Sequence, residues 1–158
     1  MSRPAVEVAP PTSADVDELI ANMREQDVAE VHAAGHADLR WVVEEGIRIS
    51  RWSLAVRVDG GLACIMGLAV RGSVLTPLGV PWLLGTPLVP KHRRVLARLA
   101  PNYIQGMLQI APRLLNMVHA RNTVAVQWLK RMGFRLHEPF ALPSGEMFHV
   151  FEMGVARV

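Results

Sequence analysis

The segment Leu114–Phe134, with the sequence LLNMVHARNTVAVQWLKRMGF, joins a strand pattern directly to a helix pattern. Its first five residues are apolar except for Asn116, which is typical of a buried strand. Asn122 can cap the N-terminus of a helix, because asparagine is a favoured N-cap residue. Gly133 can end the helix, because glycine readily adopts the left-handed conformation. Between these two signals the apolar residues follow helical spacing, at Ala125, Trp128, Leu129 and Met132. The segment therefore predicts a strand, a turn and an amphipathic helix that is capped by Asn122 and ends before Phe134.

The flanking sequence adds further strands and helices. A first strand is expected over residues 5–8, and Thr12 with Asp15 predicts a capping box at the start of a helix. Two more helical patterns run over about 27–34 and 37–49. Residues 52–58 and 62–70 are strand patterns joined by Asp59-Gly60-Gly61, which is typical of a hairpin turn. A short strand is expected over 80–84, and a last hairpin pairs residues 134–142 with 146–152. This order predicts one mixed α/β domain over residues 1–158.

The stretch Gly72–Pro90 has no charged residue over nineteen positions, as a membrane span would. It contains four prolines, and proline removes an amide hydrogen bond and clashes with the preceding turn of a helix. We therefore expect a turn, a buried strand and a loop here, and no membrane span. Pro90 suits the first turn of a long helix. Pro101 predicts that this helix breaks or bends.

Charge is distributed unevenly, although the net charge is only +3. Ten of the fourteen acidic residues precede residue 51, and none lies between Asp59 and Glu138. That interval contains ten basic residues, which are Arg71, Lys91, Arg93, Arg94, Arg98, Arg113, Arg121, Lys130, Arg131 and Arg135. Such a division favours an anionic partner on one side of the molecule. Coenzyme phosphates and nucleic acid are both open, as is the simpler interpretation that the arginines only solvate helix surfaces.

Cysteine and histidine provide few chemical signals. Cys64 is the only cysteine, which excludes an internal disulfide and favours a cytosolic setting over secretion. His32 and His36 are four residues apart, but no third ligand is evident and we assign no metal. His119 ends the strand before Asn122, where it could act as a general base. The alternative for His119 is a half-buried, hydrogen-bonded structural histidine.

The order strand, Asn122-x-x-Ala125 and Gly133-Phe134 resembles the C-terminal half of the GNAT acetyltransferase fold. The resemblance implies a mostly antiparallel central sheet flanked by helices, and acetyl-CoA as cofactor. It places the acyl thioester against the strand end formed by Leu83, Leu84, Gly85 and Thr86. It places the coenzyme phosphates near Lys91, Arg93 and Arg94, with Asn122 also at the cofactor site. His119 or water would then activate the acceptor amine.

Two positions depart from the pattern of active GNAT enzymes. Those enzymes usually open the long helix with a glycine-rich loop, whose amides approach the coenzyme pyrophosphate. The equivalent stretch here, Pro87–Arg94, has no glycine and two prolines without amide donors. Many GNAT enzymes also place a tyrosine, as general acid, seven residues after the asparagine. This chain has Leu129 there.

The chain is also similar to one branch in particular, the short-tailed phage internal virion protein A type. The residues that carry this similarity are Trp82, Lys91–Arg94, Tyr103, Met107–Leu108, Leu114, Asn116, Val118, Asn122–Thr123, Leu129–Lys130 and Gly133. The similarity implies a phage-encoded protein that is made in the host cytoplasm. It also implies the virion as a further location and other virion proteins as partners. The two resemblances and the charge distribution together leave three functions open: an acyl-CoA-dependent N-acetyltransferase with a degenerate cofactor loop, a non-catalytic virion or assembly scaffold, and a basic nucleic-acid-binding module.

Overall fold

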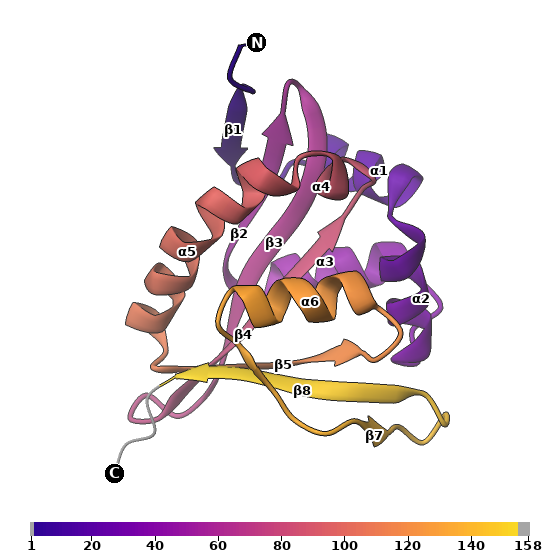
Figure 1. Cartoon of the computed structure of the whole chain (residues 1–158), viewed down its shortest axis with the longest axis vertical. Coiled ribbons are helices and arrows are strands. Elements are labelled where there is room, and N and C mark those ends of the chain that lie inside the picture. Colours follow the sequence, from indigo (N-terminus) through magenta and orange to yellow (C-terminus); the bar gives the residue numbers. More distant parts are fainter. Residues whose placement is uncertain (1, 155–158) are drawn as a thin grey trace.

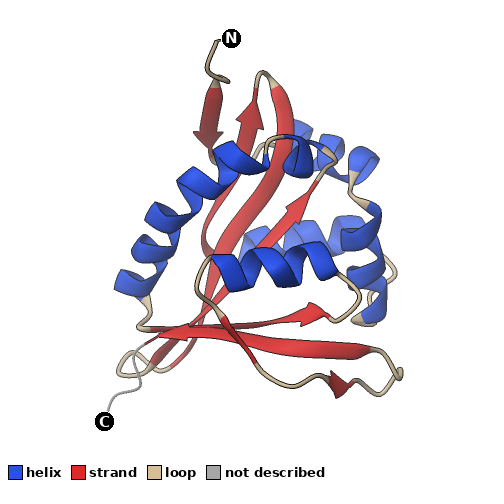
Figure 2. Ribbon diagram, in the orientation of Figure 1, coloured by secondary structure: helices blue, strands red, loops and turns tan. Residues whose placement is uncertain are grey.

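The computed structural model describes residues 2–154, which form an eight-stranded sheet with helices on both faces (Figure 1, Figure 2). The strand order is β1-β2-β3-β4-β5-β8-β6, and β7 also pairs with β8. Every pairing is antiparallel except that of β4 with β5. The strands are β1 (Val6–Ala9), β2 (Ser50–Val58), β3 (Gly61–Gly72), β4 (Pro77–Gly85), β5 (Arg113–His119), β6 (Arg135–Leu136), β7 (Phe140–Ala141) and β8 (Met147–Gly154). The predicted mixed and mostly antiparallel sheet is confirmed.

Helices cover the two faces of the sheet unequally. Helices α1 (Ser13–Asn22) and α3 (Leu39–Ile49) pack behind the sheet as drawn in Figure 1, and α2 (Glu25–Ala33) lies at its right-hand side. The short α4 (Leu88–Lys91), the long α5 (Arg93–Ile110) and α6 (Thr123–Arg131) lie in front. The front core cluster consists of Leu68, Ile104, Met107, Leu114, Val118, Val126, Leu129, Phe134 and Phe151. The rear cluster consists of Val16, Leu19, Val43, Ala55, Leu62 and Ile65.

The strand–turn–helix predicted from Leu114–Phe134 is confirmed as β5 and α6. The Asn122 side chain accepts a hydrogen bond of 3.4 Å from the Ala125 amide and so caps α6. Gly133 has φ of 98°, the left-handed value that ends the helix. The chain then turns inward, and the Phe134 ring meets Phe151 edge to face at 5.2 Å.

The hairpin at Asp59-Gly60 is confirmed as well. Asp59 and Gly60 have φ of 50° and 83°, the positive pair that matches the twist of a tight hairpin. The predicted capping box at the start of α1 is also present, since Thr12 and Asp15 bond to each other's amides. These elements were predictable because their signals are local.

Three boundaries differ from the sequence predictions. Strand β4 is longer than the predicted 80–84, because β3 pairs with it along its whole length. The long helix is interrupted at His92, and α5 then continues through Pro101 to Ile110 without the predicted break. The first arm of the last hairpin is divided into β6 and β7 around Pro139, which has no amide to donate.

The charge-free stretch Gly72–Pro90 forms the turn after β3, strand β4 and the loop into α4. Within residues 2–154, no helix is both long and apolar enough to cross a membrane.

The parallel pairing of β4 with β5 is short. It comprises only Leu78 with Arg113 and Gly79 with Leu114, and beyond these pairs the two strands diverge (Figure 1). We call the space between residues 81–85 of β4 and residues 115–119 of β5 the wedge. Near its apex the side-chain amide of Asn116 donates a hydrogen bond of 2.8 Å to the Pro81 backbone carbonyl. Further out, each strand edge needs other partners for its backbone groups.

Close packing of Trp82 on Gly67 makes this glycine sensitive to substitution. An alanine Cβ at position 67 would lie 2.7 Å from the Trp82 indole nitrogen, which is held by a 2.7 Å hydrogen bond to Ser50. We predict that Gly67→Ala lowers the free energy of unfolding by about 1–3 kcal/mol, because the indole must move. Gly106→Ala is the control, since apart from its own helical turn nothing lies within 4 Å of the methyl group it would add, and helix propensity should raise stability by about 0.5–1 kcal/mol. Urea unfolding measures both, and equal effects would contradict the packing argument.

Glu152 on β8 links three segments at the C-terminal side of the sheet. Its carboxylate accepts from Arg113 on β5 at 2.8 Å, from His137 at 2.7 Å and from Arg135 on β6. The Arg113, Arg135 and His137 side chains together lower the pKa of Glu152 to about 2.

This cluster predicts a specific acid dependence of stability. Because folding lowers the pKa of Glu152, its stabilising contribution is complete above the ordinary value of 4.5 and is lost as the pH falls toward 2. Glu152→Gln should therefore lower the free energy of unfolding by only roughly 1 kcal/mol at pH 7, because the partners of Glu152 are largely exposed. The loss should become progressively smaller below pH 4.5, as Glu152 itself becomes protonated in the wild-type protein. Unfolding curves at several pH values test this, with Glu138→Gln as an exposed control. A deficit that stays constant down to pH 2 would contradict it.

Candidate functional site at the wedge between β4 and β5

Helix α2 begins at the β4 side of the wedge and occupies the end of that strand. The Arg24 amide donates to the Gly85 carbonyl at 2.8 Å, and the Gly85 amide donates to the Asp27 carboxylate at 2.7 Å. Both Gly85 groups face β5, since the next amide, Thr86, bonds to Ala63 of β3 on the other side. Arg24, the N-cap residue of α2, and Asp27 in its first turn therefore take the hydrogen bonds that a neighbouring strand or a ligand would otherwise make with Gly85.

Asp27 is itself held by a buried ion pair. Its side chain is 2% exposed, and the Arg24 guanidinium contacts both carboxylate oxygens at 2.8–3.0 Å. A carboxylate so deeply buried requires this compensation, because desolvation strongly disfavours an unpaired charge.

The β5 side of the wedge is held by the same helix. The Glu30 carboxylate accepts a hydrogen bond from the backbone amide of His119, the last residue of β5. Burial raises the pKa of Glu30; the His119 amide lowers it, and nearby Asp27 raises it further. The Asn122 side chain also lowers the pKa of Glu30. The buried Nδ2 atom of Asn122 nevertheless makes no hydrogen bond of normal geometry within residues 2–154. We call Arg24, Asp27 and Glu30 the α2 latch, because together they bind both strands that form the wedge, β4 and β5.

A cavity of about 580 Å³ opens beside the latch. Its lining comes from α2, from the end of β5 and from the turn before β8, and comprises Glu25, Gln26, Ala29, His32, Ala33, His119, Arg121, Asn122, Ser144 and Glu146. The His119 side chain is the least exposed titratable group in this lining, and its Nε2 lies 2.8 Å from the Glu146 carboxylate. Its ring packs on Phe148 at 5.1 Å. An imidazole oriented by a carboxylate can accept a proton from a bound amine.

The predicted site residues fall into two groups. Leu83, Leu84, Gly85 and Thr86 form the last residues of β4 and the start of the following loop. Lys91, Arg93 and Arg94 are exposed at the end of α4 and in the first turn of α5. His119 and Asn122 lie together on the other side of the wedge, and both line the cavity. The α2 latch lies between these groups.

The loop from Thr86 to His92 uses most of its amides internally. The Leu88 amide donates to the Thr86 hydroxyl at 3.2 Å, and the Val89 amide donates to the Thr86 carbonyl at 3.0 Å. The His92 amide bonds to Leu88, and Pro87 and Pro90 have no amide hydrogen. Few backbone donors therefore remain here to hold a pyrophosphate group.

These observations bear on whether acetyl-CoA fits the site. A thioester at the end of β4 would need the Gly85 edge, where Asp27 and the Arg24 amide already bind. With the latch in this position, the residues present do not fit that cofactor. Among residues 2–154, no group of three histidine, cysteine or acidic side chains is placed to hold a metal ion.

Four residues of the site were not predicted from the sequence. Arg24, Asp27 and Glu30 lie at the start of and within α2, for which the sequence predicts only a helix. Glu146 is 27 positions from His119, and only the β5–β8 register, which pairs His119 with Phe148, brings the two together. For Glu146, the predicted hairpin at the C-terminal side was the one available signal.

Solved structures with the same architecture are known, although no family model and no curated protein matches the sequence. A GNAT-family acetyltransferase from Streptococcus pneumoniae has a TM-score of 0.63 at 13% identity, over 96% of this chain and 100% of that one. A GNAT-family acetyltransferase from Bacillus anthracis has a TM-score of 0.68 at 11% identity, over 96% of each chain. A candidate acetyltransferase from Salmonella typhimurium, solved with its cofactor acetyl-CoA, has a TM-score of 0.60 at 10% identity, over 98% of this chain and 96% of that one. At these identities the likeness concerns the fold, and it extends over nearly the whole molecule. This chain has the fold of the GNAT acetyltransferases.

Proposed function

We propose that the protein is a phage-encoded scaffold that uses the GNAT fold without acyl transfer, in virion assembly. The α2 latch carries this proposal, because Asp27 and the Arg24 backbone occupy the Gly85 edge that the acyl thioester would need. A ligand at this edge would leave the Arg24 amide and the buried Asp27 carboxylate each short of a hydrogen-bond partner, which costs about 1–3 kcal/mol for each group and more for the charged one. A coenzyme that had to displace both bonds would lose on the order of a thousandfold in affinity.

Two features of the sequence support the same conclusion. The loop into α5 has prolines in place of glycines, so we regard it as a degenerate cofactor loop. Leu129 stands where many GNAT enzymes have a tyrosine general acid, and such a group contributes about 10²–10⁴-fold to rate. The phage origin and the part in virion assembly rest on the resemblance described in the sequence analysis.

An N-acetyltransferase is the second candidate, and the His119–Glu146 pair in the cavity favours it. In that case His119 would take the proton of an amine acceptor, while Glu146 orients the imidazole. The latch would have to open before acetyl-CoA could reach the wedge.

Calorimetric titration with acetyl-CoA distinguishes the two candidates. The closed latch predicts no measurable binding up to millimolar coenzyme, and no thermal shift. A ligand at a hundred times its dissociation constant would stabilise the fold by about 2.7 kcal/mol, which is readily measured. Micromolar affinity that is lost in the double variant Arg93→Gln, Arg94→Gln would favour the enzyme. So would acetylation of an amine that His119→Ala abolishes.

The latch itself is tested with matched aspartate variants. Asp27→Asn leaves Arg24 buried without its counter-ion, so the free energy of unfolding should fall by about 3 kcal/mol or more. Asp17→Asn is the control, because Asp17 is 66% exposed in its pair with Arg40 and should cost less than about 1 kcal/mol. Urea unfolding at pH 7 measures both. Equal losses would show that the Arg24–Asp27 pair does not hold α2 in place.

A further inference from the structure

Helix α5 begins with positive charges where the helix dipole disfavours them. Arg93 and Arg94 are in its first turn, Lys91 precedes them, and all three side chains are exposed. The first turn contains no acidic residue, and the N-cap residue His92 makes no side-chain capping bond. Cations are destabilising at the positive end of a helix, where an anion is favoured. Residues that oppose a local preference, as these cations do at the start of a helix, are expected at functional sites.

The same three cations belong to a larger set without acidic partners. Six arginines outside α4, α5 and α6 form ion pairs, and they are Arg24, Arg40, Arg48, Arg57, Arg113 and Arg135. Four others have no such pair within residues 2–154, but they are scattered over the N-terminal segment, β2, β3 and the turn before α6: Arg3, Arg51, Arg71 and Arg121. By contrast, α4, α5 and α6 carry six exposed cations with no carboxylate within 4 Å among residues 2–154. These are Lys91, Arg93, Arg94, Arg98, Lys130 and Arg131, which we call the basic face.

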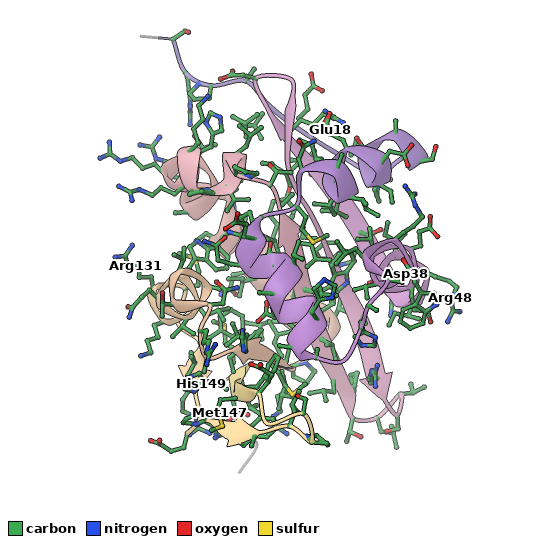
Figure 3. The ribbon with its side chains drawn as sticks, turned by 90° about the vertical axis from the view of Figure 1, so that its right-hand side faces the viewer. Glu18, Asp38, Arg48, Arg131, Met147 and His149 are labelled. Carbon is green, nitrogen blue, oxygen red and sulfur yellow. The ribbon has the colours of Figure 1, made fainter. Side chains whose placement is uncertain are left out.

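These cations lie on one side of the molecule. Helices α5 and α6 pack on a common core and cover the same face of the sheet. In Figure 3, Arg131 projects from α6 on the side opposite α3, where Asp38 and Arg48 are labelled. The absence of acids between Asp59 and Glu138 in the sequence thus becomes a separation of charge in space.

We propose that the basic face binds the phosphate backbone of double-stranded nucleic acid. A single pyrophosphate does not require six cations over three helices, and the wedge that would receive the rest of a coenzyme is held by α2. Single strands are usually bound by stacking on aromatic side chains. Here Tyr103 and Trp128 are half-buried against the core, and the exposed aromatics Trp41 and Phe140 lie on α3 and β7. Contacts to the backbone of a duplex need only charge and a helix terminus.

This proposal does not depend on whether the protein transfers acyl groups. Neutralising about six phosphates predicts a slope of about −5 for the logarithm of the association constant against the logarithm of salt concentration. Affinity should therefore fall roughly a thousandfold between 50 and 200 mM salt.

Fluorescence anisotropy with a labelled 20-base-pair duplex tests the proposal on the full chain. We expect the double variant Arg93→Gln, Arg94→Gln to reduce the salt slope by about 2 and to weaken binding at least tenfold at 50 mM salt. The control is Arg40→Gln, Arg48→Gln, which removes the same charge from α3 and should change affinity less than threefold. The Arg93, Arg94 variant should also unfold at the same or a higher urea concentration, because it removes cations from a helix N-terminus. A loss of affinity therefore cannot be attributed to unfolding.

Three results would overturn the proposal. The first is no duplex binding by the wild-type chain at 50 mM salt, or equal losses in the two double variants. The second is displacement of the duplex by 1 mM coenzyme A, which would assign the basic face to coenzyme phosphates. The third is binding to vesicles with 30% anionic lipid at salt concentrations where the duplex no longer binds. Unchanged duplex affinity in the presence of coenzyme A, with the expected slope, supports it.

Discussion

The short parallel contact between β4 and β5 constrains the rest of the structure. After two residue pairs the strands separate, and the backbone groups on both facing edges lose the partners that a continuous sheet would provide. Buried amides and carbonyls must still be paired. Near the apex Asn116 bridges the gap. Further out the partners are Arg24, which is the N-cap residue of α2, and Asp27 and Glu30 within that helix. The position of α2 is therefore a consequence of the divergence of the two strands.

Most of the fold was predictable because its signals lie within a few residues of each other. Asn122 with Gly133 bounds a helix, and Asp59-Gly60 closes a hairpin, wherever these motifs occur between suitable apolar patterns. The extent of β4 was not predictable, because the neighbouring strand β3 sets it. Residues of the site were harder still. An acid on a helix, such as Asp27, has the same sequence signature whether it faces water or a buried strand end.

The two faces of the sheet differ in how charge is balanced. On the side of α1 and α3, acids and arginines form pairs such as Arg57 with Asp15 and Arg40 with Asp17. On the side of α5 and α6, the six cations of the basic face have no carboxylate within 4 Å in the described part of the chain. Hydrophobic burial against α5 and α6 stabilises this layer despite the repulsion. Both faces of the sheet thus bury a hydrophobic cluster, but ion pairs balance the exposed charges mainly on the side of α1 and α3.

The place of β8 in the sheet has a consequence for how the chain folds during synthesis. This strand is the last in the described sequence, yet it lies between β5 and the edge strands β6 and β7. Strands β1 to β4 are contiguous and can pair as they leave the ribosome, since each pairs with the strand next to it in the sequence. The front core cannot close until Phe151 arrives, because Phe151 belongs to that cluster. A nascent chain halted before β8 would present the open edge of β5, and with it a template for pairing with another chain.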